Sequence, residues 1–72
     1  MTAHEMAQLT RAELQAACDS SPEVRDRFER QYGGQPVTLY GMYHTMFLKD
    51  CLRHGIPVPP HVLAEYEQLN LT

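Results

Sequence analysis

Cys51 and His54 are the two residues whose types and spacing come closest to a chemical motif. They form a C-x-x-H pair, His61 follows seven positions later, and Cys18 would supply the remaining ligand of a tetrahedral zinc ion. Structural zinc sites usually contain two close pairs of ligands, whereas this chain has one such pair. We therefore favour a buried cysteine beside surface histidines that flank a loop, and we predict no metal and no other cofactor.

The same two residues, or His44, are the candidates for catalysis. Cys51 and His54 would lie near each other if they are three residues apart on a helix. A nucleophile and its base also need a cleft, usually of roughly a few hundred Å³, and a few short helices leave little room for one. The chain has no glycine-rich phosphate loop and no Ser/His/Asp order. We predict that it is not an enzyme. A metal- or cysteine-dependent small enzyme is kept as an alternative, and it requires a bound metal or a thiol of low pKa.

The charge of the chain opposes nucleic-acid binding. Nine acidic residues face six basic ones, for a formal net charge of −3, and affinity for a phosphate backbone comes from Lys and Arg. The break at 33–37 has the length of the turn in a helix-turn-helix, but the segment after it is too apolar for a major groove. For these two reasons, a small nucleic-acid-binding transcriptional regulator is kept as the first alternative and not as the main prediction. The cations that could form a basic strip are Arg25, Arg27, Arg30, Lys49 and Arg53.

The first three residues of that strip, all arginines, alternate with acids and are expected to form a salt-bridged solvent face instead. This segment also has the clearest helix signals, with Ser21 as N-cap, Pro22 as first helical residue and Gly33 as stop. The expected ion pairs are Glu23–Arg27, Arg25–Glu29 and Asp26–Arg30.

Proline, glycine and serine residues divide the chain into four segments. The patterns within these segments predict a mainly all-α fold in one small domain spanning residues 1–72. We expect three to four short helices around a central apolar helix over 39–54, which ends at Gly55. A short strand near 35–40 is the alternative, although nothing obvious would pair with it. Capping boxes, in which a threonine and a glutamate three residues later cap each other, are predicted at Thr2/Glu5 and Thr10/Glu13.

The central segment is unusually rich in aromatic and methionine side chains, which are common both in cores and at protein interfaces. Leu48 and Leu52 lie outside its main apolar arc, Gly41 is expected to mark a close helix approach, and a 72-residue domain cannot easily bury every side of one helix. Part of this surface is therefore expected to contact a partner or a second copy of the chain. The predicted anchors are the exposed members of the set Tyr40, Tyr43, Phe47, Leu48 and Tyr66.

Three acidic residues, Asp50, Glu65 and Glu67, are predicted to steer the chain to a basic partner surface or to mimic nucleic acid. These features together predict a non-enzymatic protein-interaction module: a small inhibitor, adaptor or regulatory protein that acts on a larger protein, with a homodimer as the alternative. In size, acidity and aromatic content, the profile resembles that of the small proteins with which phages modify host enzymes, host RNA polymerase among them. The resemblance implies a role in transcription regulation.

No membrane partner is predicted, because no apolar run approaches the ~18 residues that span a bilayer. The N-terminus has neither the basic region nor the apolar stretch of a signal peptide. We therefore expect a cytoplasmic protein in which Cys18 and Cys51 are reduced thiols.

Overall fold

The protein is described by a computed structural model, which places residues 1–66. These residues form five α-helices and one 3-10 turn, and no strand occurs among them, so the predicted all-α fold class is confirmed. The alternative of a strand at 35–40 is wrong, because those residues form turns. The elements are α1 (Ala3–Ala7), α2 (Arg11–Ser20), α3 (Pro22–Tyr32), η1 (Thr38–Gly41), α4 (Met42–Arg53) and α5 (Pro60–Leu63).

Reciprocal hydrogen bonds start the first two helices. The Thr2 hydroxyl accepts the backbone N–H of Glu5 at 3.2 Å, and the Glu5 carboxylate accepts that of Thr2 at 3.0 Å. Thr10 and Glu13 repeat the arrangement at 3.2 and 2.9 Å. Both capping boxes predicted from the sequence are confirmed.

Helix α3 has the predicted boundaries but not the predicted ion pairs. It begins at Pro22, and its C-cap is Gly33. Ser21 occupies the N-cap position, but its side chain makes no capping hydrogen bond. None of the three expected pairs forms a direct salt bridge on this helix; in the part of the chain that the structure describes, the ion pair present joins Arg53 to Asp50 at 3.3 Å. Exposed pairs are worth little because water screens them, so the helix does not depend on them.

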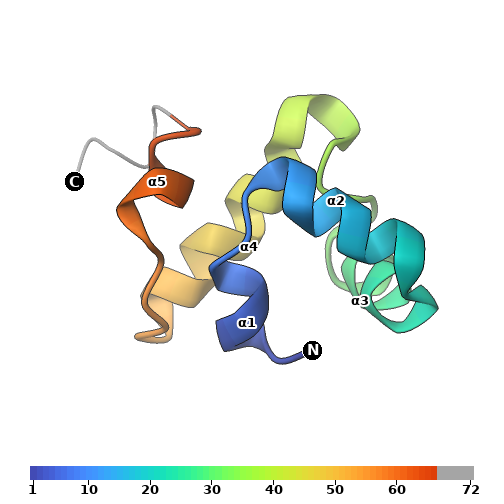
Figure 1. The fold of residues 1–72 in the computed structure, drawn as a ribbon, viewed down its shortest axis with the longest axis horizontal. Helices are drawn as coiled ribbons and strands as arrows, with labels where there is room; N and C mark the ends of the chain where they lie inside the picture. Colours follow the sequence, from blue (N-terminus) through green and yellow to red (C-terminus); the bar gives the residue numbers. More distant parts are fainter. Residues whose placement is uncertain (67–72) are drawn as a thin grey trace.

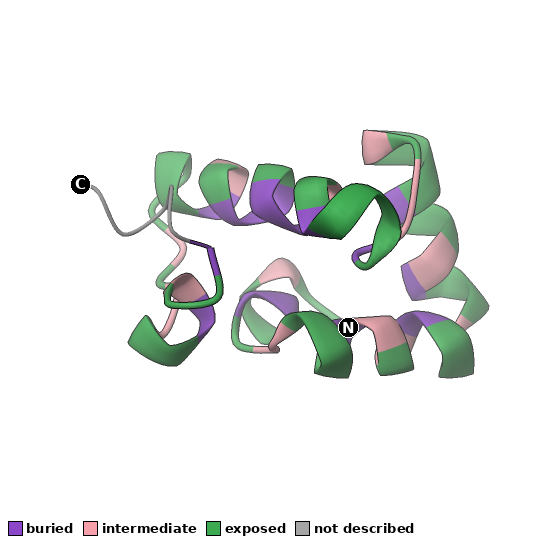
Figure 2. Ribbon diagram, turned by 90° about the horizontal axis from the view of Figure 1, so that it is seen from above, coloured by how far each residue is buried: buried purple, intermediate pink, exposed green. Residues whose placement is uncertain are grey.

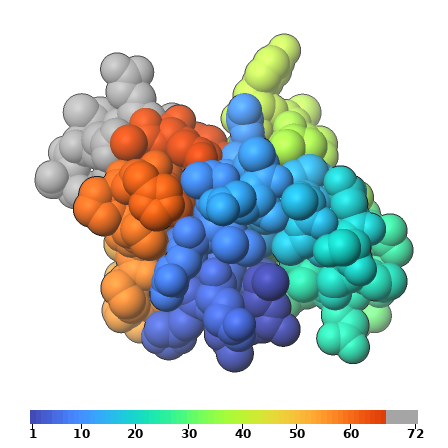
Figure 3. Space-filling view, in the orientation of Figure 1, coloured from blue at the N-terminus to red at the C-terminus, as the bar shows by residue number. Residues whose placement is uncertain are grey.

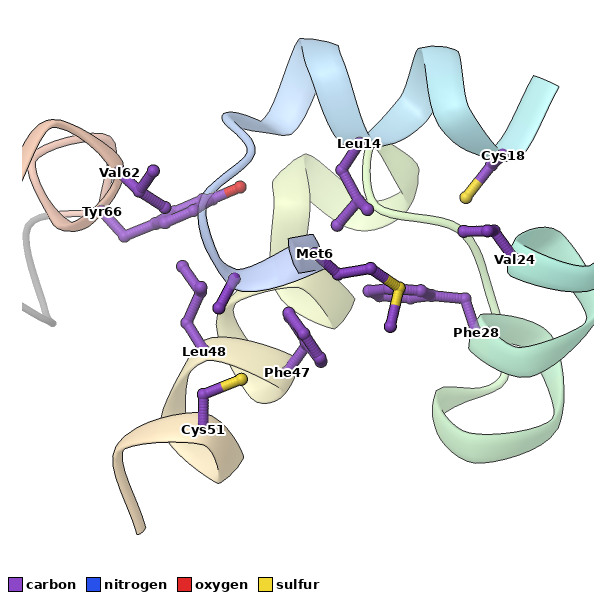
Figure 4. Close-up of a cluster of buried hydrophobic side chains, with 11 residues drawn as sticks. Met6, Leu14, Cys18, Val24, Phe28, Phe47, Leu48, Cys51, Val62 and Tyr66 are labelled. Atoms are coloured by element: carbon purple, nitrogen blue, oxygen red, sulfur yellow. The ribbon is translucent and has the colours of Figure 1, made fainter. Parts of the chain in front are cut away.

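Helix α4 is the central element, as predicted, and Figure 1 shows it in the middle of the molecule, between α5 and the pair α2 and α3. Its buried residues face α1, α3 and the C-terminal segment, whereas its opposite side is exposed (Figure 2). Within the core, Met6 of α1, Leu14 of α2 and Phe28 of α3 converge (Figure 4). The rings of Phe28 and Phe47 lie 5.4 Å apart between centroids, which joins α3 to α4. No helix within residues 1–66 has both the length and the apolar character needed to cross a membrane.

The predicted start of the central helix is wrong by three residues. Leu39 and Tyr40 have positive φ angles of 53° and 57°, in the left-handed region, so α4 begins at Met42 rather than at residue 39. Gly41 stands at the N-cap position of α4, without a side-chain capping bond.

Candidate interaction surface

Three of the five predicted aromatic and leucine anchors are buried in the core. They are therefore not exposed to a partner, and their prediction as partner contacts is corrected. Phe47 is 5% exposed because it packs on Phe28, and Leu48 is fully buried although it lies outside the main apolar arc of α4. The reason is that α4 is covered on two sides. Figure 4 shows Leu48 pointing toward Val62 and Tyr66 of the C-terminal segment, and Tyr66 is itself only 8% exposed.

The acidic candidates have partners within the chain. The Asp50 carboxylate accepts the Tyr32 hydroxyl at 2.9 Å and an N–H of Arg53 at 3.3 Å. Both Glu65 carboxylate oxygens accept the backbone N–H of Arg11, at 3.0 and 3.3 Å, so Glu65 caps the N-terminus of α2 from 54 residues away. Glu67 lies outside the described residues. Asp50 and Glu65 therefore have structural roles, which leaves their predicted steering of a partner without support.

Exposed apolar side chains gather instead on η1 and the first turns of α4. Tyr40 is 96% exposed, and Tyr43 is partly buried against the core. Figure 3 shows residues 38–41, in yellow-green, projecting at one edge of the molecule. Tyr40 was predicted from the sequence by its residue type, whereas Val37 was missed. The other exposed apolar side chains in this region were assigned to the apolar arc of a core helix. We call this set the turn patch; its members are Val37 (47% exposed), Leu39 (55%), Tyr40, Met42 (45%) and Met46 (41%).

Hydrogen bonds fix the chain on both sides of the turn. Gln15 of α2 donates to the Gln35 side-chain oxygen at 2.7 Å and accepts the backbone N–H of Val37 at 3.4 Å. Gln35 in turn donates to Glu29 of α3 at 3.0 Å. At the other end, the Thr45 hydroxyl donates to the carbonyl of Gly41 at 3.1 Å. The turn patch is thus presented by a segment that is tied to three helices.

Leu39 and Tyr40 hold a backbone conformation that disfavours them. For an L-residue other than glycine, the left-handed helical region costs about 1–2 kcal/mol, and it is unusual for bulky side chains. Tyr40 recovers almost none of this cost by burial, since its side chain is 96% exposed. Strained residues that do not contribute to the core are concentrated at functional sites in proteins.

Tyr40→Gly is expected to leave the free energy of unfolding unchanged or to raise it by up to about 1.5 kcal/mol. Glycine gains about 1–2 kcal/mol at positive φ, and its extra freedom in the unfolded chain offsets about 0.4–1 kcal/mol of that gain. Equilibrium unfolding in urea measures the change. A loss of more than about 1 kcal/mol would show that the ring packs on the protein and is not free for a partner.

Neither family models nor curated proteins nor solved structures match this chain. The case for a function therefore rests on the residues themselves.

Within the described residues, the candidates for a reactive thiol or a zinc site do not form a catalytic pocket or a set of metal ligands. Cys51 is buried, and burial raises the pKa of its thiol to about 11, so it is protonated at neutral pH. It borders a cavity of about 120 Å³ together with the exposed His54, and this volume is below the usual roughly 300 Å³ of a ligand pocket. Cys18 is also a buried free thiol. Within residues 1–66, no group of three His, Cys, Asp or Glu side chains could hold a metal ion.

The expected surface histidines beside the buried Cys51, which are His54 and His61, are exposed, and His44 differs from them. Three histidines are exposed, but His44 is fully buried on α4. Its Nδ1 lies 2.7 Å from the Tyr66 hydroxyl, the two rings meet edge to face, and its Nε2 has no hydrogen-bond partner. Since the ring is closed off from solvent, it does not form an open catalytic site. It supports the packing of Tyr66 beneath the turn.

Proposed function

We propose that this protein is a non-enzymatic interaction module that binds a larger protein through the turn patch. One observation carries the proposal: Tyr40, almost wholly exposed, is held in a left-handed conformation on a turn that is tied to three helices. The left-handed backbone of Tyr40 costs free energy, and the exposed ring does not recover that cost by burial. A contact between the ring and a partner would explain why a tyrosine stands at this position.

The chemistry of the turn patch supports this use. Tyrosine offers a large, stiff, amphipathic surface and is enriched among residues that dominate binding energy, and methionine adapts its shape to an uneven partner surface. Because residues 38–41 project, the partner needs a pocket that receives the ring (Figure 3). Host RNA polymerase, implied by the resemblance in profile, is one candidate among such larger proteins. We place this action in the cytoplasm, which the free thiols of Cys18 and Cys51 support.

Loss of binding in Tyr40→Asn tests the proposal, because asparagine tolerates the left-handed conformation and removes only the ring. Immobilised wild type and variants are incubated with lysate treated with nuclease, and retained proteins are quantified by mass spectrometry. The matched control is Leu52→Asn, which removes an apolar side chain of 43% exposure outside the turn patch. We expect one dominant protein to be retained by wild type and Leu52→Asn, and retention by Tyr40→Asn to fall about tenfold or more.

Other outcomes of this experiment decide against the proposal. Equal retention by Tyr40→Asn and wild type would place the contact elsewhere on the chain. Retention from untreated lysate that is absent with nuclease-treated lysate would favour the nucleic-acid-binding alternative. If no protein is retained and the wild type sediments as a dimer that Tyr40→Asn breaks, then the partner is a second copy.

A further inference from the structure

The outward face of α4 continues the turn patch along the helix. Met42, Met46, Lys49 and Arg53 follow one another at spacings of four, three and four residues, which places them on one side of a helix. All four are exposed. Figure 2 shows this side of α4 facing away from the other helices. We call these four residues the α4 stripe; it extends for about 16 Å along the helix axis.

The two ends of the α4 stripe differ in chemistry. Met42 and Met46, next to the turn, are apolar, whereas Lys49 and Arg53 carry positive charge. Asp50, the acid beside them, already accepts hydrogen bonds from Tyr32 and from Arg53. The Arg53 side chain stays 72% exposed in its pair with Asp50, so that pair is weak. This end of α4 is therefore locally basic, in a chain whose formal net charge is −3.

A second copy of the chain does not complement this face. Two α4 stripes packed in parallel would set Lys49 and Arg53 of each copy against the same cations of the other. Packed antiparallel, the cations would cover the methionines of the other copy and lose water without gaining a carboxylate. Both arrangements bury charge without a partner, which costs free energy.

We propose that the partner of the turn patch is a different protein, whose contact surface is apolar where it meets Tyr40, Met42 and Met46 and carries carboxylates opposite Lys49 and Arg53. This inference rests on the proposed function and specifies its partner. The partner surface is acidic, opposite in sign to the basic surface predicted from the acidic residues, because Asp50 and Glu65 bond within the chain while the exposed cations of α4 border the patch.

Selection from a random peptide library displayed on a carrier tests this chemistry without knowledge of the natural partner. Wild-type protein is the bait, and binding of enriched peptides is measured against four baits: wild type, Tyr40→Asn, the double variant Lys49→Glu/Arg53→Glu, and the control Arg25→Glu/Arg30→Glu. The control makes the same change of charge on α3, away from the stripe. Circular dichroism of each variant confirms that the baits are folded.

We expect enriched peptides to combine aromatic or aliphatic residues with Asp and Glu. Their affinity should fall about tenfold or more for Lys49→Glu/Arg53→Glu at about 0.05 M salt, with a smaller fall as salt rises, and should change less than about twofold for the control. Enriched peptides that are basic or neutral, or that bind Lys49→Glu/Arg53→Glu as well as wild type, would overturn the acidic partner. If such peptides still lose binding to Tyr40→Asn, the proposed function survives. Peptides indifferent to Tyr40→Asn, or no enrichment at all, would overturn both.

Discussion

Gly41→Ala is expected to lower the free energy of unfolding by about 3 kcal/mol. Gly41 has φ 80°, where an alanine costs about 1 kcal/mol or more. A Cβ added there would also lie 2.8 Å from both Cε1 and the hydroxyl oxygen of Tyr66, closer than such atoms approach. Tyr66 is buried and bonded to His44, so it cannot move aside freely, and overpacking of this kind costs about 1–3 kcal/mol.

Gly55→Ala is the matched control for this prediction. Gly55 has nearly the same backbone angle, φ 75°, but nothing lies within 4 Å of an added Cβ. Its substitution should therefore cost only the backbone contribution of about 1 kcal/mol. Urea unfolding of both variants isolates the steric part as the difference between them. Equal losses at the two positions would show that Tyr66 does not pack on Gly41.

The Tyr66→Leu background tests the same contact from its other side. Leucine lacks the ring atoms that the new Cβ would meet, so Gly41→Ala should then cost about as much as Gly55→Ala. A penalty that stays near 3 kcal/mol in this background would point to Arg11 as the obstructing group, because its side-chain Cδ would lie 3.2 Å from the added Cβ.

The helix boundaries set by neighbouring residues were predictable from the sequence. A threonine and a glutamate three positions apart cap each other wherever they start a helix, and proline and glycine limit φ in ways that do not depend on the rest of the fold. The capping boxes, Pro22 and Gly33 are confirmed for this reason. The close helix approach predicted at Gly41 is wrong in its partner, because the group nearest to an added Cβ is the ring of Tyr66 and not a helix.

Burial that depends on distant contacts was not predictable from periodicity. The apolar arc of α4 identifies one side for the core, but Leu48 is buried by Val62 and Tyr66, which return to the helix from the C-terminal segment. Glu65 was misplaced for the same reason, since its carboxylate meets the N-terminus of α2 only after that return. No local pattern encodes which acid will find a helix end more than fifty residues away.

The candidate site likewise has one feature that the sequence predicts and another that depends on contacts between distant residues. Tyr40 could be named from its residue type, because tyrosine in an apolar segment is either core or interface. Its left-handed backbone could not, since leucine and tyrosine next to an apolar helix favour continuing that helix. The hydrogen bond between Gln15 and Gln35 holds the chain before the turn, and it joins residues twenty positions apart.

His44 makes the stability of the fold depend on pH in a window of its own. The ring is fully buried with an unpartnered Nε2, and burial, with a smaller contribution from the Arg11 guanidinium on α2, lowers its pKa from 6.5 to about 4. The group that faces it from the C-terminal segment is the neutral Tyr66 hydroxyl. In the unfolded chain the ring takes up a proton near pH 6.5, whereas in the native protein it stays neutral down to about pH 4.

The unfolded state therefore binds more protons between these two pKa values, so the free energy of unfolding should be level above pH 6.5 and fall by about 3 kcal/mol as the pH drops toward 4. Urea unfolding across this range, with His44→Phe as control, measures the slope. Phenylalanine keeps an aromatic ring against Tyr66 and cannot be protonated, so its stability should stay nearly level until the lowered pKa values of Glu5 and Glu13, below 4.5, come into play. An equal slope in both proteins between pH 6.5 and 4.5 would mean that His44 is protonated in the native state. With about 3–5 kcal/mol available to a domain of this size, the wild type should keep only about 0.5–2.5 kcal/mol at pH ~4.5, whereas the stability of His44→Phe should not change between pH 6.5 and 4.5.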